Sequence, residues 1–258
     1  MPTPIYSADF FAGRVDGSTR SAREILKIVK ETLNPSSVVD IGCGTGAWLK
    51  VWLELGVEDI LGIDGDYVLP DQLLVPLDRF RAMDLSRPTE LSRQFDLVQS
   101  LEVAEHLPEE AAGSFISFLC SLGPVVLFSA AIPLQGGANH VNEQWPEYWA
   151  KLFLAKGYVA IDNIRDRVWD HPDIDFWYCQ NTLVFVRADN PGATEKFGGF
   201  PIGSSQRPLS RVHPRLWLQT NEILQRPLSL ERLIKMLPLS TRDFAARIRR
   251  KIKRTSAK

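Results

Sequence analysis

The chain has 258 residues, of which 45% are apolar, 24% charged and 10% aromatic, and its 30 basic side chains nearly balance its 31 acidic ones. This composition is typical of a globular protein, and it excludes collagen-like, low-complexity and fully disordered chains. The longest apolar run, residues 125–134, is about half of the ~20 residues that a membrane-spanning helix needs, and residues 1–9 lack the features of a secretory signal. The three scattered cysteines match neither a disulfide framework nor a zinc motif. We therefore expect a cytoplasmic enzyme or binding protein.

The basic side chains are concentrated at the C-terminal end. Residues 240–258 hold eight Lys and Arg side chains against one acid, Asp243, so the rest of the chain is net acidic. An acidic body argues against nucleic-acid binding by that body. Phe244, Ile248 and Ile252 recur every four residues among the basic ones, which is typical of a helix lying on an anionic membrane surface. Peripheral contact with the inner membrane surface is one hypothesis for this tail. Nucleic-acid contact by the tail alone and a solvated tail with no partner are the others.

Short apolar segments alternate with helical patterns along residues 20–187. An amphipathic helix is predicted over 20–33, and the strands that follow it are predicted at 37–41, 59–64, 95–100 and 124–129. Further helices are predicted at 48–55, 108–122 and 146–156. Two last apolar runs, 158–164 and 181–187, have no strong helical pattern between them and are predicted to close the sheet as a strand pair. This order predicts a mostly parallel sheet with helices on both faces.

The character of the chain changes after Arg187. We predict a main domain over residues 1–187, followed by a linker or draped loop over 188–214, where Gly, Pro and Ser are frequent. Residues 215–258 are predicted to form a helical appendage, with helical patterns at 215–224 and 229–237 ahead of the basic tail.

Three alternating glycines, Gly42, Gly44 and Gly46, lie between the first predicted strand and the next helix. Glycines at such a turn let the backbone approach a ligand closely, and the free amides of the helix N-terminus can donate to it. Gly42, Gly44 and Ala47 also fit a degenerate dinucleotide fingerprint, which leaves an oxidoreductase as one alternative. Asp40 argues against that alternative, because its charge would repel a pyrophosphate but attract an ammonium or sulfonium group.

The segment Asp40–Gly46, with the sequence DIGCGTG, resembles motif I of the class I S-adenosylmethionine-dependent methyltransferases. Asp64 resembles the family's acidic residue that accepts the ribose hydroxyls, and Asp84 the residue that binds the adenine amino group. Residues 100–108, with the sequence SLEVAEHLP, are similar to the family's segment beside the reacting methyl group. The resemblance implies an α/β fold of three layers, Rossmann-like, with a seven-stranded, mostly parallel sheet and an antiparallel last strand. It implies S-adenosylmethionine as cofactor and the following cofactor-binding residues: Asp40, Gly42, Cys43, Gly44, Gly46, Asp64, Met83, Asp84 and Ser100.

Glu102, Glu105 and His106 are spaced so that one helical turn would present two carboxylates and an imidazole together. His140, after the strand predicted at 124–129, is expected to face the same crevice. We predict His106, His140 and Glu105 as catalytic residues. The pattern resembles metal-dependent O-methyltransferases, and such ligands suit Mg²⁺, Mn²⁺ or Zn²⁺. Related methyltransferases with no metal carry a similar segment, so the metal is left open.

The expected reaction is methyl transfer from S-adenosylmethionine to an oxygen of a small-molecule, sugar or glycan acceptor. Metal-assisted O-methylation of a ribose or of a catechol- or quinol-like hydroxyl is an alternative, and a non-catalytic S-adenosylmethionine-binding module is another. Polar residues at 139–145 either cap the next helix or line an acceptor pocket through His140, Gln144 and Trp145. Residues 169–181, rich in aromatic and amide side chains, either roof that pocket or belong to the core.

Overall fold

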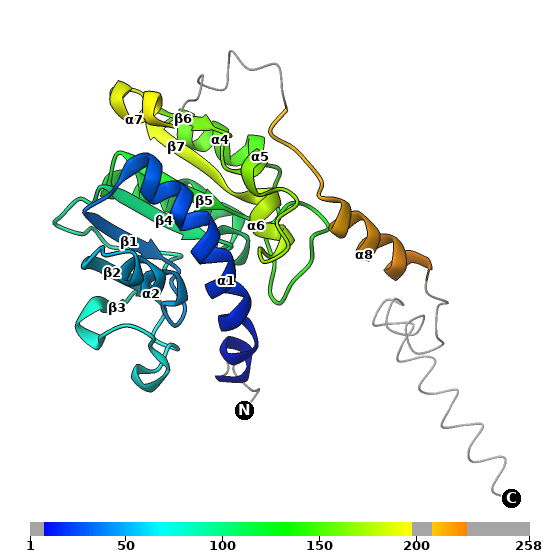
Figure 1. Cartoon of the computed structure of the whole chain (residues 1–258), viewed down its shortest axis with the longest axis horizontal. Coiled ribbons are helices and arrows are strands. Elements are labelled where there is room, and N and C mark those ends of the chain that lie inside the picture. The colour runs from blue at the N-terminus through cyan, green and yellow to red at the C-terminus, as the bar shows by residue number, and fades with distance from the viewer. Residues whose placement is uncertain (1–7, 198–207, 226–258) are drawn as a thin grey trace, which may run out of the picture. The chain divides into compact units, whose positions relative to one another are not determined.

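The computed structural model describes residues 8–197 and 208–225, with the side chains of 15–190, 192–197 and 208–222. Its centre is a seven-stranded sheet in the order β3-β2-β1-β4-β5-β7-β6 (Figure 1). The strands are β1 (Ser37–Ile41), β2 (Asp59–Asp64), β3 (Phe80–Ala82), β4 (Leu97–Leu101), β5 (Val125–Ser129), β6 (Tyr158–Ile161) and β7 (Leu183–Arg187). β7 runs antiparallel to both β5 and β6, and the other pairs are parallel. The predicted fold class is confirmed, including the antiparallel last strand.

The α-helices of the described chain are α1 (Ala8–Leu33), α2 (Ala47–Glu54), α3 (Ala112–Leu122), α4 (Pro146–Leu154), α5 (Arg165–Val168), α6 (Phe176–Asn181), α7 (Pro191–Lys196) and α8 (Pro214–Gln225). Four 3-10 turns complete the order: η1 (Pro70–Gln72), η2 (Leu77–Arg79), η3 (Ala104–His106) and η4 (Glu109–Ala111). None of the described helices is both long and apolar enough to cross a bilayer.

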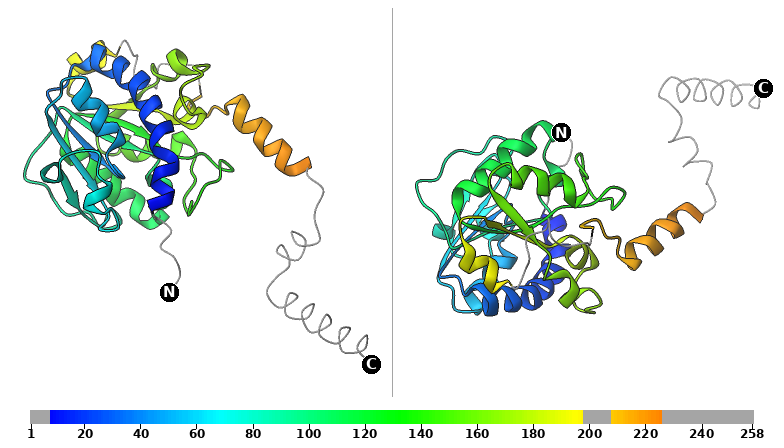
Figure 2. Two further views of the ribbon diagram at one scale, coloured as in Figure 1. Left: turned by 60° about the horizontal axis from the view of Figure 1, so that its bottom comes forward. Right: turned by 90° about the horizontal axis from the view of Figure 1, so that it is seen from above.

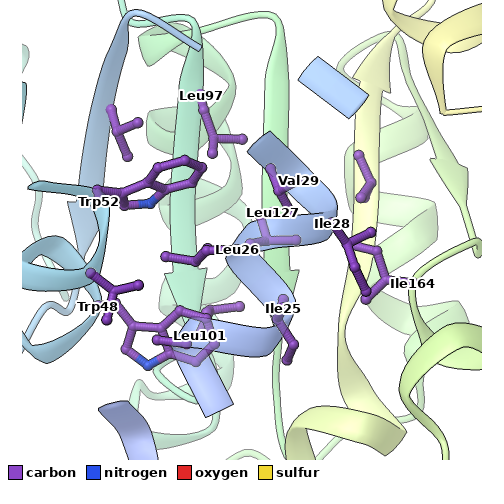
Figure 3. Close-up of a cluster of buried hydrophobic side chains, with 14 of the residues drawn as sticks. Ile25, Leu26, Ile28, Val29, Trp48, Trp52, Leu97, Leu101, Leu127 and Ile164 are labelled. Carbon is purple, nitrogen blue, oxygen red and sulfur yellow. The ribbon is translucent and has the colours of Figure 1, made fainter. Parts of the chain in front are cut away.

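The strands are mostly apolar because helices cover both faces of the sheet. Neighbouring residues of a strand point to opposite sides, so Val38 joins one core and Val39 the other. On the first side, Leu26 and Val29 of α1 and Trp52 of α2 pack over β1, β4 and β5 (Figure 3). On the second side, helices α3 and α4 supply the aromatic and aliphatic side chains of the other core. Figure 2 shows α1, in blue, and α3, in green, on opposite sides of the sheet. The molecule therefore has the three predicted layers.

Helix α1 begins well before the predicted helix at 20–33. At Gly17 and Ser21 it packs against Asp175 through a glycine and a hydroxyl. A Cβ on Gly17 would lie 2.4 Å from Asp175 Oδ2, and Ser21 Oγ accepts a hydrogen bond of 3.0 Å from the Asp175 backbone N–H. An apolar periodicity cannot reveal such a contact, because it is made by a glycine and a hydroxyl.

Two short helices, α5 and α6, connect β6 to β7, where the sequence showed no strong helical pattern. They span four and six residues, too short for a helical repeat to be visible. Arg165 of α5 is completely buried: its guanidinium pairs with Asp162 and donates to the carbonyl oxygens of Gln180 (3.0 Å) and Leu209 (2.8 Å). This arginine holds the 209–213 segment against α6.

The chain divides into two units with a boundary after Leu216, and the sheet and its helices belong to the first. The domain limits predicted at 187 and 214 stay a prediction. The predicted helix at 229–237 and the basic tail at 240–258 lie outside the described residues, and so does the membrane contact proposed for that tail.

Candidate active site

The chain turns sharply after β1, and the turn requires glycine. Gly42, Gly44 and Gly46 have φ values of +82°, +53° and +85°, in the left-handed region that favours glycine. The Gly42 N–H donates to Ile63 O (2.7 Å), which ties the turn to the end of β2. A Cβ on Gly42 would lie 2.3 Å from Val103 Cγ2. Gly42 is therefore required both by its dihedral angle and by the close approach of Val103.

Asp64 ends β2 and faces this turn. Its Oδ2 accepts a hydrogen bond from the Gly44 N–H (2.6 Å), and its Oδ1 accepts one from the Gly65 N–H (2.7 Å) and one from the Tyr67 hydroxyl. The side chain is buried. Burial raises the pKa of Asp64, and the hydrogen bonds from Tyr67, Gly44 and Gly65 offset part of that rise. The carboxylate thus links the glycine turn to the loop after β2.

A cavity of about 720 Å³ opens beside these groups at the carboxyl ends of the parallel strands. Its lining residues are Gly42, Gly44, Asp64, Gly65, Asp66, Tyr67, Ala82, Met83, Asp84, Leu85, Ser86, Glu102, Val103, His106 and Leu107. Six predicted site residues share this one space: Gly42, Gly44, Asp64, Met83, Asp84 and His106. The turn after β1, the loops after β2 and β3, and the segment after β4 thus open onto one cavity.

Other predicted cofactor residues do not line this cavity. Asp40 is buried in β1, in register with Gly62 and Gln99 on the neighbouring strands. Burial raises the pKa of Asp40 to about 8, and nearby Asp64 adds to that rise, while the Gln99 amide lowers it. Cys43 packs under β2, where a Cβ on Gly62 would lie 2.8 Å from its Sγ.

Gly46 caps α2 in the left-handed region, and Ser100 is buried in β4. The Ser100 Oγ has no hydrogen-bond partner among the residues that the structure describes. Neither residue lines the cavity.

Asp84 is exposed on the loop after β3. Its Oδ1 accepts hydrogen bonds from the Ser86 backbone N–H (2.9 Å) and the Ser86 hydroxyl (2.7 Å), and these bonds lower its pKa. The carboxylate therefore caps a turn and at the same time lines the cavity.

The segment after β4 does not form the single helical turn that the spacing of Glu102, Glu105 and His106 predicted. Glu102 has a left-handed φ of +57°, and only Ala104–His106 form a 3-10 turn. The bend separates the two carboxylates by environment: Glu102 reaches the cavity, while Glu105 is completely buried. Burial raises the pKa of Glu105 well above its usual range, and the charge of Glu102 adds to the effect.

His140 does not line the cavity, yet the fold brings it to His106. The Glu105 carbonyl oxygen accepts hydrogen bonds from Val141 N–H (2.9 Å) and Asn142 N–H (3.0 Å), which hold the loop after β5 against η3. The His106 and His140 rings meet edge to face, with centroids 4.9 Å apart.

Glu143 orients this loop. The sequence predicted only that residues 139–145 cap the next helix or line a pocket. Its carboxylate accepts hydrogen bonds from His140 Nδ1 and from the Leu134 and Gly136 backbone N–H groups, each 2.8 Å long. The pairing sets the direction of the His140 ring, since Nδ1 is the nitrogen committed to Glu143.

Three amide side chains, which we call the amide cluster (Gln135, Gln180 and Asn181), hold Glu102. Gln135 Nε2 donates to one carboxylate oxygen (2.9 Å) and Asn181 Nδ2 to the other (3.0 Å). Gln180 Nε2 donates to Gln135 Oε1 (3.1 Å), while its own Oε1 accepts from the His213 backbone N–H (2.8 Å). Burial raises the pKa of Glu102, and these bonds partly counteract it. The sequence did not predict the contact of Gln135 with Glu102, because no characteristic spacing links the two residues.

A divalent cation would find suitable donors at this end of the site. Ligand atoms of Glu105, His106 and His140 all lie within 4.8 Å of one another. Both Glu105 carboxylate oxygens are buried without a hydrogen-bond partner among the described residues. A bound cation would satisfy them. One carboxylate and two imidazoles are a donor set for Zn²⁺, Mn²⁺ or Mg²⁺.

Comparison with known proteins identifies the family and the fold. A family model described as a methyltransferase domain matches residues 14–162, more than half of the chain. None of the curated proteins matched. A solved structure of Streptomyces venezuelae DesVI is similar over 69% of this chain and 95% of its own, with 16% identity and a TM-score of 0.51. The plantazolicin methyltransferase BpumL, solved with a desmethyl plantazolicin analogue and SAH, is similar over 70% of this chain and 88% of its own, with 13% identity and a TM-score of 0.52.

At these identities the solved structures establish the fold alone, whereas the family model establishes the family. The strand order, the glycine turn and the cavity are those expected for that family. The chain belongs to the methyltransferase-domain family and is a class I S-adenosylmethionine-dependent methyltransferase.

Proposed function

We propose that the protein transfers the methyl group of S-adenosylmethionine to a hydroxyl oxygen of a small-molecule, sugar or glycan acceptor. The observation that carries this proposal is the single cavity whose lining includes Gly42, Asp64 and Asp84 as well as His106. A donor bound along the glycine turn would present its sulfonium methyl toward the segment after β4. An acceptor can then attack it in line.

The donor side of the proposal rests on groups that can pair with S-adenosylmethionine. Asp64 would accept the ribose hydroxyls, and Asp84 the adenine amino group. Met83 and Leu85, both buried and both lining the cavity, would contact the adenine ring. Asp40 lies behind the glycine turn, where the positive charge of a bound donor would favour the ionised form of its carboxyl group. Cys43, Gly46 and Ser100 would shape the turn and the strand end without touching the donor.

The acceptor side would supply a base. As the acceptor oxygen forms its bond to the methyl carbon, the carbon–sulfur bond breaks, S-adenosylhomocysteine leaves and the hydroxyl proton has to be removed. His106 lines the cavity and can accept that proton. His140, held by Glu143, would fix the His106 ring from its edge, and buried Glu105 would hold the turn and the loop together through its backbone carbonyl.

Release of S-adenosylhomocysteine tests this proposal. We would incubate the protein with isotope-labelled S-adenosylmethionine and separate pools of sugars, nucleotide sugars and phenols, and compare His106→Ala with His171→Ala. His171 is partly exposed and does not line the cavity. Loss of one general base costs about 10²–10⁴-fold in rate, so His106→Ala should fall by that factor and His171→Ala should not. Donor binding with no turnover on any pool would favour the non-catalytic binding module instead.

Metal-assisted O-methylation of a ribose or of a catechol- or quinol-like hydroxyl is a second candidate. It is favoured by the grouping of Glu105, His106 and His140 within 4.8 Å. A bound cation would acidify and orient an acceptor hydroxyl. Calorimetric titration with Mg²⁺, Mn²⁺ or Zn²⁺ alone tests it. Wild type and His171→Ala should bind the cation, and His140→Ala should lose affinity for it by at least about tenfold. Equal heats for all three proteins, or none, would reject the metal.

A further inference from the structure

Three groups of the protein donate hydrogen bonds to the carboxylate of Asp64. A carboxylate offers about four lone-pair positions. Among the described residues, Gly65 N–H and the Tyr67 hydroxyl both donate to Oδ1, and Gly44 N–H donates to Oδ2. One position, on Oδ2, is left for a ligand. A carboxylate that binds two neighbouring ribose hydroxyls needs two.

The three donors to Asp64 differ in how readily they can leave. Gly44 and Gly65 donate through backbone N–H groups, which the glycine turn and the end of β2 hold in place. Tyr67 donates through a hydroxyl at the end of a side chain that is 39% exposed and lines the cavity. Because this donor belongs to a side chain, a change of side-chain torsion moves it without a change in the backbone.

The ring of Tyr67 lies close to Gly65 in the backbone that follows β2. A Cβ on Gly65 would lie 2.1 Å from Tyr67 Cε1, so the ring occupies space that only a glycine leaves open. This contact explains why the hydroxyl reaches back to Asp64, three residues earlier in the chain. It also places the ring at the wall of the cavity beside Asp66 and Gly65.

We propose that Tyr67 is a placeholder in the donor site: its hydroxyl takes the position on Asp64 that one ribose hydroxyl needs, and donor binding displaces it. The inference rests on the proposed donor site. The hydroxyl satisfies the buried carboxylate when no donor is present, since an unpaired buried carboxylate is costly. Donor affinity is correspondingly lower than it would be for an empty carboxylate, because the Tyr67 bond must break first.

Calorimetry with S-adenosylhomocysteine and its 2′-deoxy and 3′-deoxy analogues tests the placeholder. The variants are Tyr67→Phe, which keeps the ring and removes the hydroxyl, and Tyr148→Phe as a matched control whose side chain does not line the cavity. Tyr67→Phe should bind S-adenosylhomocysteine roughly tenfold more tightly than wild type, the size of one hydrogen bond to a charged group. Tyr148→Phe should match wild type.

The deoxy analogues separate competition from a general effect on the pocket. A ligand with one ribose hydroxyl can use the remaining position on Oδ2, so for at least one analogue the gain from Tyr67→Phe should fall to about twofold or less. Weaker binding by Tyr67→Phe, no change, or an equal gain for all three ligands would overturn the proposal. If neither wild type nor Tyr67→Phe binds S-adenosylhomocysteine, the proposed donor site fails and the placeholder fails with it.

Discussion

The two ends of the cavity are built in different ways. At the proposed donor end, much of the cavity wall is backbone: Gly42 and Gly44 have positive φ and line the cavity, and the Gly44 and Gly65 amides hold the Asp64 carboxylate. At the proposed acceptor end, side chains hold one another: Gln135 and Asn181 bind Glu102, and Glu143 binds His140 beside His106.

This difference determines what each end tolerates. A backbone site depends on dihedral angles and close approach, so a single added carbon disrupts it. A side-chain site depends on partners from distant parts of the chain, so removal of one partner leaves another unpaired in the interior. We expect donor binding to respond to changes at the first end and methyl transfer to respond to changes at the second.

The largest effect should follow Gly42→Ala. The variant places a Cβ 2.3 Å from Val103 in a left-handed residue, and we expect loss of S-adenosylhomocysteine binding and about 4 kcal/mol of stability. Gly56→Ala is the matched control: Gly56 has a φ of +81° with nothing near its would-be Cβ. It should cost only about 1 kcal/mol and leave binding unchanged. Similar urea unfolding curves and affinities for both variants would show that close approach at Gly42 is unimportant.

Asp40 should make the free energy of unfolding depend on pH. Its pKa is about 8 in the folded protein and near 3.8 in the unfolded chain, so the folded state holds the proton more tightly. The resulting stability is complete below about pH 4 and is lost as pH rises through 8. Between pH 5 and 8, wild type should lose on the order of 3 kcal/mol more than Asp40→Asn, measured by urea unfolding. Parallel pH profiles would contradict this.

Asn181→Leu should separate the two ends most clearly. It removes one hydrogen bond from the partly buried Glu102 carboxylate, which should lower the free energy of unfolding by about 2 kcal/mol. Methyl transfer should fall, while S-adenosylhomocysteine affinity stays within about twofold, because no donor-side group is touched. Glu102→Gln in the same background should restore part of the lost stability, since an amide is cheaper to leave unpaired than a carboxylate. Loss of donor affinity in the single variant would contradict the division of the cavity.

Asp84→Ala should give the smallest change in stability. The exposed carboxylate caps Ser86, and its loss should cost about 0.5–1 kcal/mol. If Asp84 also binds the adenine, S-adenosylhomocysteine affinity should fall about tenfold in calorimetry. Ser86→Ala, which removes only the hydroxyl contact, should keep the affinity within about twofold. Equal affinities for both variants would leave Asp84 as a turn cap alone.

The glycine turn could be predicted from the sequence because Gly42, Gly44 and Gly46 are close together in the chain. The family resemblance assigned Asp64 to the same site, and the mostly parallel sheet followed from the alternation of strands and helices. The amide cluster could not be read, because Gln135 and Asn181 lie 33 and 79 residues from Glu102 and meet it only in the folded chain. The left-handed bend at Glu102 was hidden for a related reason: the pairing of its backbone N–H with Ser129 on β5 sets it, not the local spacing.

The central claim is that the carboxylate of Asp64 forms the base of the donor site. Calorimetric titration of wild type, Asp64→Asn and Asp66→Asn with S-adenosylhomocysteine tests it most directly, because Asp66 is an exposed carboxylate of the same cavity and its replacement removes the same charge. We predict that wild type and Asp66→Asn bind alike and that Asp64→Asn loses at least about tenfold in affinity. Equal binding by all three proteins, or no heat with wild type, would contradict the account.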